Sequence, residues 1–227
     1  MQLEILKAAD RGFIQAATHK GYPLFKNHKG FGKVHAANDQ YLYPEVYLGK
    51  EPYTQAEIVT ILLNGKASFT NHEGQQQSLT EGAVQLVKTG TGIEWWGHNQ
   101  SLTDRARYFQ LIITPRKQAL VASEAIKLPG MPVMRNTWMP FINPTGSEGA
   151  LQVDQDVWAF RGVFDRGHHM YAMQSTQHGL LAYVLSGKLK VGEEVVETED
   201  TIFLEDAAAL EFEALHASEI LLVETVL

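Results

Sequence analysis

The feature that most constrains the fold is an internal repeat, in which one strand–turn–strand–turn–strand pattern occurs twice. Residues 60–67 are echoed by residues 182–189, and both copies carry Gly-Lys directly after the turn. Residues 79–86 are then echoed, in the same order, by residues 196–203. Self-similarity of this kind is typical of chains built from copies of one supersecondary unit. The sequence therefore predicts two similar β domains in tandem.

Turn and strand signals inside the repeat favour an all-β fold of two barrels or sandwiches. Residues 58–63 can form a strand with two apolar faces, and Asn64-Gly65 is the strongest hairpin signal, because type I′ turns need positive φ at both central positions. An apolar strand closes each copy, at Phe109–Ile113 and at Ile220–Val223. Few helical segments compete with this prediction.

The segment between the copies differs in character. Residues 118–127 have high helix propensity and predict a short helix. The best linker candidate follows, marked by Pro129, Pro132, Pro140 and Pro144. We therefore expect one domain at residues 1–125 and a second at 126–227, with the option that a strand at residues 2–6 pairs with the second domain. Residues 12–32 are expected to be loops, with His19 and His28 as solvated loop histidines.

Composition and charge limit the class of protein. The net charge is −7 and there is no run of Lys and Arg, so direct nucleic-acid binding is disfavoured. There are no cysteines, which excludes disulfides, thiolate metal sites and Cys nucleophiles. Residues 1–7 lack a signal-peptide pattern, and no stretch reaches the ~18 apolar residues of a membrane span. We expect a cytoplasmic protein that does not bind membranes.

A series of short motifs runs along the chain. In the first half these motifs are Gly30-Phe31-Gly32, Asn38, Pro44, Glu57-Ile58-Val59-Thr60, Gly82, Gly90-Thr91-Gly92 and Asn99, with looser matches at Gln110 and Pro115. In the second half the motif is the Leu185-Ser186-Gly187 turn. Together these motifs make up a resemblance to the pirin family of bicupins. It implies two tandem cupin barrels of the double-stranded β-helix (jelly-roll-like) type, an N-terminal one at 1–125 and a C-terminal one at 126–227.

The resemblance also implies where a metal site would lie. Pirins typically hold one iron in the N-terminal barrel with three histidines and a glutamate, arranged as pairs at i and i+2 that point to one face of a strand. The matching positions here hold Glu51, Tyr53, Trp95 and Gly97. Tyr53 binds metal only as a phenolate, Trp95 offers only an N–H donor and Gly97 offers nothing. We therefore expect a pirin scaffold with no metal cofactor and a pocket at these four positions, in which Trp95 fills the core.

A substitute metal site is the alternative, with one Fe or another divalent ion. Glu57, Glu94 and His98 are near the four positions in sequence, and Glu57 matches a ligand position of many other cupins. Glu94 and His98 have the wrong parity for the inward face, so at most some of these side chains face the barrel interior. In the second half, the doublet His168-His169 cannot chelate alone because adjacent strand residues point opposite ways. These two residues and His178 are interpreted as loop histidines.

Two functions from different classes remain. The first is a non-catalytic pirin-like protein that binds a small molecule or a protein partner in a sensing or regulatory role. The second is a metal-dependent enzyme of the quercetin 2,3-dioxygenase type, an activity that the resemblance implies for some pirins. No Ser-His-Asp order, phosphate loop or nucleotide fingerprint is present. The replaced ligand quartet favours the first function, and predicts no stoichiometric metal and no degradation of quercetin.

Overall fold

The computed structural model describes residues 1–25, 30–70, 73–117, 121–129 and 134–227. In these ranges the chain is built of strands, with two short 3-10 helices, η1 (Ala8–Asp10) and η3 (Ser147–Gly149). The strands up to the linker are β1 (Gln2–Leu6), β2 (Ile14–Gln15), β3 (His19–Pro23), β4 (Val34–Leu42), β5 (Glu51–Tyr53), β6 (Glu57–Asn64), β7 (Lys66–Thr70), β8 (Gln76–Thr80), β9 (Val84–Lys88), β10 (Ile93–Trp95), β11 (Gly97–His98), β12 (Ala106–Ile113) and β13 (Ser123–Lys127). The strands after it are β14 (Thr137–Asn143), β15 (Leu151–Gln152), β16 (Val157–Phe164), β17 (Gly167–Ala172), β18 (His178–Ser186), β19 (Lys188–Val191), β20 (Glu194–Glu197), β21 (Thr201–Glu205), β22 (Ala209–Ala214) and β23 (Ser218–Val226).

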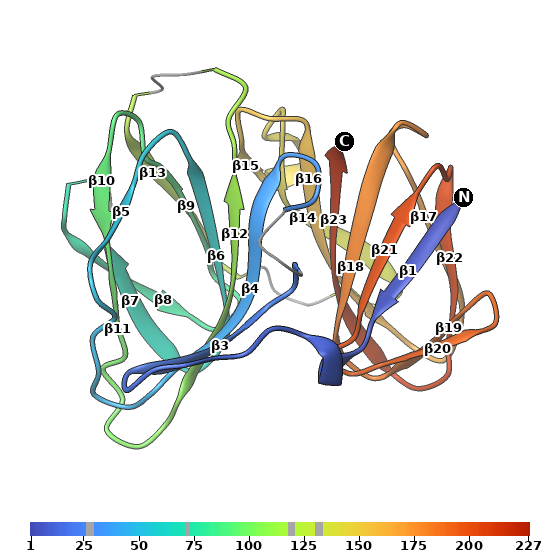
Figure 1. Cartoon of the computed structure of the whole chain (residues 1–227), viewed down its shortest axis with the longest axis horizontal. Coiled ribbons are helices and arrows are strands. Elements are labelled where there is room, and N and C mark those ends of the chain that lie inside the picture. Colours follow the sequence, from blue (N-terminus) through green and yellow to red (C-terminus); the bar gives the residue numbers. More distant parts are fainter. Residues whose placement is uncertain (26–29, 71–72, 118–120, 130–133) are drawn as a thin grey trace.

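These strands form two barrels side by side (Figure 1). Each barrel contains a seven-stranded sheet, in the order β13-β9-β6-β12-β4-β3-β2 in the first and β1-β21-β18-β23-β16-β14-β15 in the second. Smaller sheets, β11-β7-β8 and β10-β5 in the first barrel and β17-β22-β19-β20 in the second, complete them. No helix in the described residues is long and apolar enough to cross a membrane.

The predicted all-β repeat is confirmed. The hairpin β6–β7 turns at Gly65 and the hairpin β18–β19 turns at Gly187, both with positive φ (83° and 107°). A Cβ at Gly187 would lie 2.6 Å from the Cα of Ser218, so only glycine fits this turn. The predicted closing strands are β12 and β23, which pair with β6 and β18 in equivalent places.

The N-terminal segment of the chain links the two barrels. β1 pairs antiparallel with β21, from Gln2 opposite Glu205 to Leu6 opposite Thr201. The first strand of the chain thus lies in the second barrel, as Figure 1 shows, and the chain then crosses to β2 and β3 in the first.

Four local expectations are wrong. Ser123–Lys127 is not helical but forms edge strand β13 along β9, because sheet pairing outweighs the helix propensity of this segment; residues 118–120 lie outside the described residues. The boundary between residues 125 and 126 therefore falls inside β13.

Residues 14–23 form β2 and β3 rather than loops, so His19 is a strand residue; His28 lies outside the described residues. Pro140 lies inside β14, next to an irregularity in its pairing that accommodates the missing N–H.

The two seven-stranded sheets pack against each other through a shared apolar core. Odd-numbered residues of β6 (Val59, Ile61) join this core with residues of β16, β18 and β23, whereas even-numbered residues (Ile58, Leu62) fill the first barrel. This alternation decides which side chains can reach the interior of the first barrel.

A buried ionic cluster also joins the barrels. The carboxylate of Asp39, on β4, accepts hydrogen bonds from Arg107 Nε (3.0 Å) and Nη2 (2.9 Å) and from the Tyr183 hydroxyl on β18 (2.8 Å). Arg11 donates to the Tyr183 hydroxyl (2.9 Å) and to Glu199 (2.6 Å). Asp39 is fully buried, so its charge depends on these partners.

Two buried tyrosine hydroxyls should make the stability of the fold depend on pH in the alkaline range. Burial raises the pKa of Tyr108, and burial together with the charge of Asp39 raises the pKa of Tyr183. A pKa raised in the folded state means that stability is complete below the unfolded pKa of about 10 and is lost above it. We expect the free energy of unfolding to fall above about pH 10, by about 1.4 kcal/mol per pH unit for each phenol. Urea unfolding of the wild type and of Tyr108→Phe from pH 8 to 11 tests this: the variant should lose stability less steeply, and equal slopes would contradict it.

Candidate functional site

Three of the four positions that match pirin ligands lie together on the ribbon β5–β10. Trp95 pairs with Glu51 and Ile93 pairs with Tyr53, so Glu51, Tyr53 and Trp95 share one end of the first barrel. The fourth position, Gly97, lies on β11 opposite Phe69 of β7. The structure thus brings the predicted pocket residues into one region.

Glu51 and Tyr53 form a hydrogen-bonded pair and not a ligand pair. The Tyr53 hydroxyl donates to Glu51 Oε2 over 2.8 Å. Burial, and then this bond to Glu51, raises the pKa of Tyr53. Tyr53 is therefore a neutral phenol in this arrangement, and its hydroxyl is bonded to one of the two oxygens of the Glu51 carboxylate.

Aromatic rings occupy the space at the other two positions. The Trp95 indole is 3% exposed, stacks on Phe69 with ring centroids 5.3 Å apart, and meets Tyr53 edge-on at 6.4 Å. A Cβ at Gly97 would lie 2.8 Å from two ring carbons of Phe69 and 3.2 Å from Leu48. The expectation that Trp95 fills the core agrees with this packing. An iron site of the pirin type does not fit these residues, because the ring of Phe69 leaves no room for a side chain at residue 97.

The three additional candidates do not complete a substitute site. Glu57 points away from the first barrel, where both its oxygens accept the Asp154 N–H (2.8 and 2.9 Å) and Lys88 lies 3.3 Å away. Burial raises the pKa of Glu57, against the opposing effects of these two partners. Glu94 is exposed and pairs with Lys50, and His98 stacks on Tyr47 at 3.8 Å. Among the described residues, no three His, Asp or Glu side chains come together in a way that could hold a metal ion.

Sequence reasoning missed a row of polar side chains inside the first barrel. Asn38, Gln110, Thr60 and Gln85 lie directly opposite one another across β4, β12, β6 and β9. We call these four residues the polar row. Three of them have at most 2% of their surface exposed: Gln110, Thr60 and Gln85. In the part of the chain that the structure describes, one polar atom of each has no hydrogen-bond partner, namely Gln110 Nε2, Thr60 Oγ1 and Gln85 Oε1. Most buried polar atoms in folded proteins are paired, so these three atoms make the polar row a candidate site for a ligand or a bound water.

A cavity of about 150 Å³ opens at one end of the polar row. Asn38, Gln110, Glu51 and Tyr53 line it, and the hairpin β2–β3 covers it with residues that include His19. In the sequence, Asn38, Thr60 and Gln110 stand out only as motif positions, and their alignment in one row with Gln85 requires the strand pairing to be known.

The second barrel contains its own buried carboxylate. Glu224, fully buried, accepts hydrogen bonds from the Tyr171 hydroxyl (2.8 Å) and the Gln174 N–H (2.9 Å), and lies 2.6 Å from His178 Nδ1. His178 is therefore a strand residue with a buried partner, not a loop histidine as expected from the sequence. His168 and His169 are also strand residues and not the loop histidines expected from the sequence; they are neighbours on β17 and alternate in exposure.

The fold, two cupin barrels joined through their large sheets, defines a bicupin. Two family models match the chain: "Pirin" at residues 7–113 and "Quercetinase C-terminal cupin domain" at residues 141–225. The chain belongs to the pirin family.

Relatives and solved structures agree with this assignment. The chain is 23% identical to a quercetin 2,3-dioxygenase of Escherichia coli K12 over 199 residues, covering 87% of this chain and 84% of that protein. It is 25% identical to the pirin-like protein YhaK of the same organism over 183 residues, covering 78% and 74%. The crystal structure of the bacterial pirin YhhW from Escherichia coli in complex with nickel(II) superposes with a TM-score of 0.90 at 21% identity, covering 99% of each chain. At this identity the likeness shows the fold.

Proposed function

We propose that this pirin-family bicupin binds a small polar molecule in its first barrel, in a sensing or regulatory role, and that it is not catalytic at the position of the family metal site. The observation that carries the proposal is Gln110, which lines the cavity of about 150 Å³ and whose Nε2 is buried and unpaired among the described residues. An unpaired buried amide costs about 1–3 kcal/mol, so a ligand that accepts its hydrogen bond recovers that free energy on binding.

The chemistry of the cavity favours a compact ligand with both donors and acceptors. Gln110 and Asn38 present amides, and Glu51 presents a carboxylate with one oxygen already bonded to Tyr53. Glu51 is exposed at the rim, so the charged group lies where the cavity meets solvent. A small neutral or weakly basic molecule fits this arrangement better than an apolar one.

A screen by thermal unfolding tests the binding function. Small polar metabolites are added to the wild type and to Gln110→Met, and the midpoint of unfolding is recorded. We expect compounds that raise the Tm of the wild type but not of the variant. If every compound that stabilises the wild type stabilises the variant equally, the polar row does not bind ligand and the proposal is wrong.

In the ligand-free protein, the unpaired amide of Gln110 should lower the free energy of unfolding. We expect Gln110→Met to raise the free energy of unfolding by about 1 kcal/mol, because it removes an unpaired buried amide at similar volume. Gln155→Met is the matched control, since Gln155 is also buried but donates to Thr114 O (3.0 Å) and accepts the Asp156 N–H (2.9 Å). The control should lose stability in urea unfolding, and a loss in both variants would contradict the interpretation of Gln110.

The second candidate function is a quercetin 2,3-dioxygenase with substitute ligands, favoured by the name of the Escherichia coli relative. The purified protein is incubated with quercetin in air, with and without added iron(II) or nickel(II), and the flavonol absorbance is followed. We expect no loss beyond that in buffer with the same metal. Metal-dependent turnover that saturates with quercetin would contradict the proposed function and support the enzyme.

A further inference from the structure

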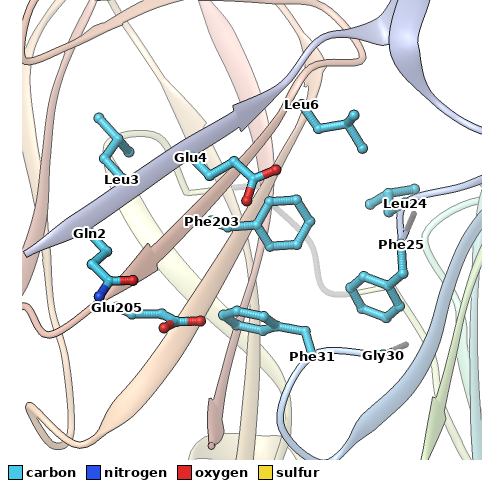
Figure 2. A pocket seen from close by; sticks show the side chains of 10 residues that line it. All are labelled: Gln2, Leu3, Glu4, Leu6, Leu24, Phe25, Gly30, Phe31, Phe203 and Glu205. Carbon is cyan, nitrogen blue, oxygen red and sulfur yellow. The ribbon is translucent and has the colours of Figure 1, made fainter. Parts of the chain in front are cut away.

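A second cavity, of about 330 Å³, lies where the beginning of the chain meets the second barrel (Figure 2). Strands β1 and β21 form one side of it, and residues 24, 25, 30 and 31, which precede β4, form the other. The cavity is separate from the first-barrel pocket and shares no lining residue with it. Its volume is within the range of small-molecule sites.

Three phenylalanine rings line this cavity. Phe203 lies centrally in Figure 2, with ring centroids 5.3 Å from Phe31 and 6.1 Å from Phe25. Phe31 is held by backbone hydrogen bonds in both directions with Val34 (2.8 and 3.0 Å). Its ring also packs over Gly179, where an added Cβ would lie 2.5 Å from Phe31 Cζ. The aromatic surface is therefore positioned before any ligand arrives.

Two carboxylates border the same cavity. Glu4 pairs across the sheet with Phe203, and Glu205 pairs with Gln2, so the two glutamates are diagonal neighbours on one face of β1 and β21. Figure 2 shows both side chains among the lining residues, close to the aromatic rings. In the described part of the chain, neither carboxylate has an ion pair or a hydrogen bond from a side chain or the backbone.

We propose that this cavity binds a small organic cation, an ammonium group that carries an apolar or aromatic substituent. The faces of aromatic rings attract cations, most strongly those that are weakly hydrated, and two nearby carboxylates add a direct charge attraction. The apolar substituent packs on the three phenylalanine rings while the ammonium group lies between Glu4 and Glu205. The net charge of −7 also favours the approach of a cation over that of an anion.

The two carboxylates give the site its selectivity. An anion of the same size is repelled by both, and a neutral molecule gains only the aromatic packing. Diagonal like charges on neighbouring strands also repel each other, so a bound cation removes a repulsion that the free protein carries.

The experiment uses phenyltrimethylammonium as the probe and tert-butylbenzene as its uncharged isostere. Binding to the full chain is measured by ligand-observed NMR at low ionic strength. The variants are Glu4→Gln, Glu205→Gln and the double variant, all of similar volume to the wild type. Glu194→Gln on β20 is the control, because it removes one exposed strand carboxylate that does not line the cavity. Thermal unfolding confirms that each variant is folded.

We expect saturable binding of the cation that weakens about fivefold to tenfold in each single variant, and further in the double variant. The control should bind as the wild type does, and added salt should weaken binding to the wild type. Equal binding by the double variant, equal binding of the uncharged isostere, or no saturable binding of the cation would each overturn the proposal. A Phe203→Leu variant that retains full affinity would overturn the aromatic part of it.

Discussion

Replacing Asp39 with alanine is expected to lower the free energy of unfolding by about 3–5 kcal/mol, because it leaves buried positive charge without its main partner. Asp39 is fully buried and accepts two hydrogen bonds from Arg107 and one from Tyr183. Arg107 is on β12 of the first barrel and Tyr183 is on β18 of the second, so the loss falls on the contact between barrels. Urea unfolding at neutral pH measures the effect.

The matched control is Asp156→Ala. Asp156 also pairs with an arginine, Arg116, but both side chains are about half exposed (44% and 55%). Exposed ion pairs contribute about 0–1 kcal/mol, so the control should lose little. Equal losses in Asp39→Ala and Asp156→Ala would show that the buried cluster does not hold the barrels together.

The second large effect concerns metal binding after the family ligands are restored. The variant Glu51→His, Tyr53→His, Trp95→His and Gly97→Glu has the three histidines and one glutamate of the pirin motif. We expect it to bind no stoichiometric nickel(II), because a side chain at residue 97 meets the ring of Phe69 at 2.8 Å. Adding Phe69→Ala removes this obstruction and should produce binding of one nickel ion per chain, measured by isothermal titration calorimetry.

Two controls keep this experiment decisive. Phe69→Ala alone should bind no nickel, and it should be destabilised by about 3–5 kcal/mol as a buried aromatic truncation. If the five-fold variant does not fold, Phe69→Leu replaces the alanine at a smaller cost. Nickel binding by the variant with four substitutions would show that residue 97 can hold a ligand side chain without the removal of the Phe69 ring. If the variant with all five substitutions folds but binds no nickel, the backbone no longer has the geometry of the family site.

Much of the fold could be predicted from local signals. The Asn64-Gly65 turn and its counterpart Ser186-Gly187 predict the two hairpins. The repeat that these hairpins belong to predicts two β barrels. The segment 123–127 was mistaken for a helix because its propensity is local, whereas its pairing with β9 depends on an edge that only the folded sheet provides. The pairing of β1 with the second barrel likewise depends on which edge is free.

The site was predictable only at the positions of a known motif. Glu51, Tyr53, Trp95 and Gly97 were identified through the resemblance, and the structure places them in one region. Phe69 was not identified, because its effect on Gly97 comes from a cross-strand contact 28 residues away in sequence. The polar row was missed for a related reason: its four residues are on four strands, and only the register aligns them.

The most direct test of the account is the metal content of the purified wild-type protein. Iron, nickel, copper and zinc are measured by elemental analysis, before and after incubation with nickel(II) and gel filtration. We expect substoichiometric metal in both samples, because the Tyr53 hydroxyl donates to Glu51, Trp95 is packed in the core and Phe69 fills the space beside Gly97. One metal ion per chain, retained through gel filtration and lost in Glu51→Gln, would contradict it.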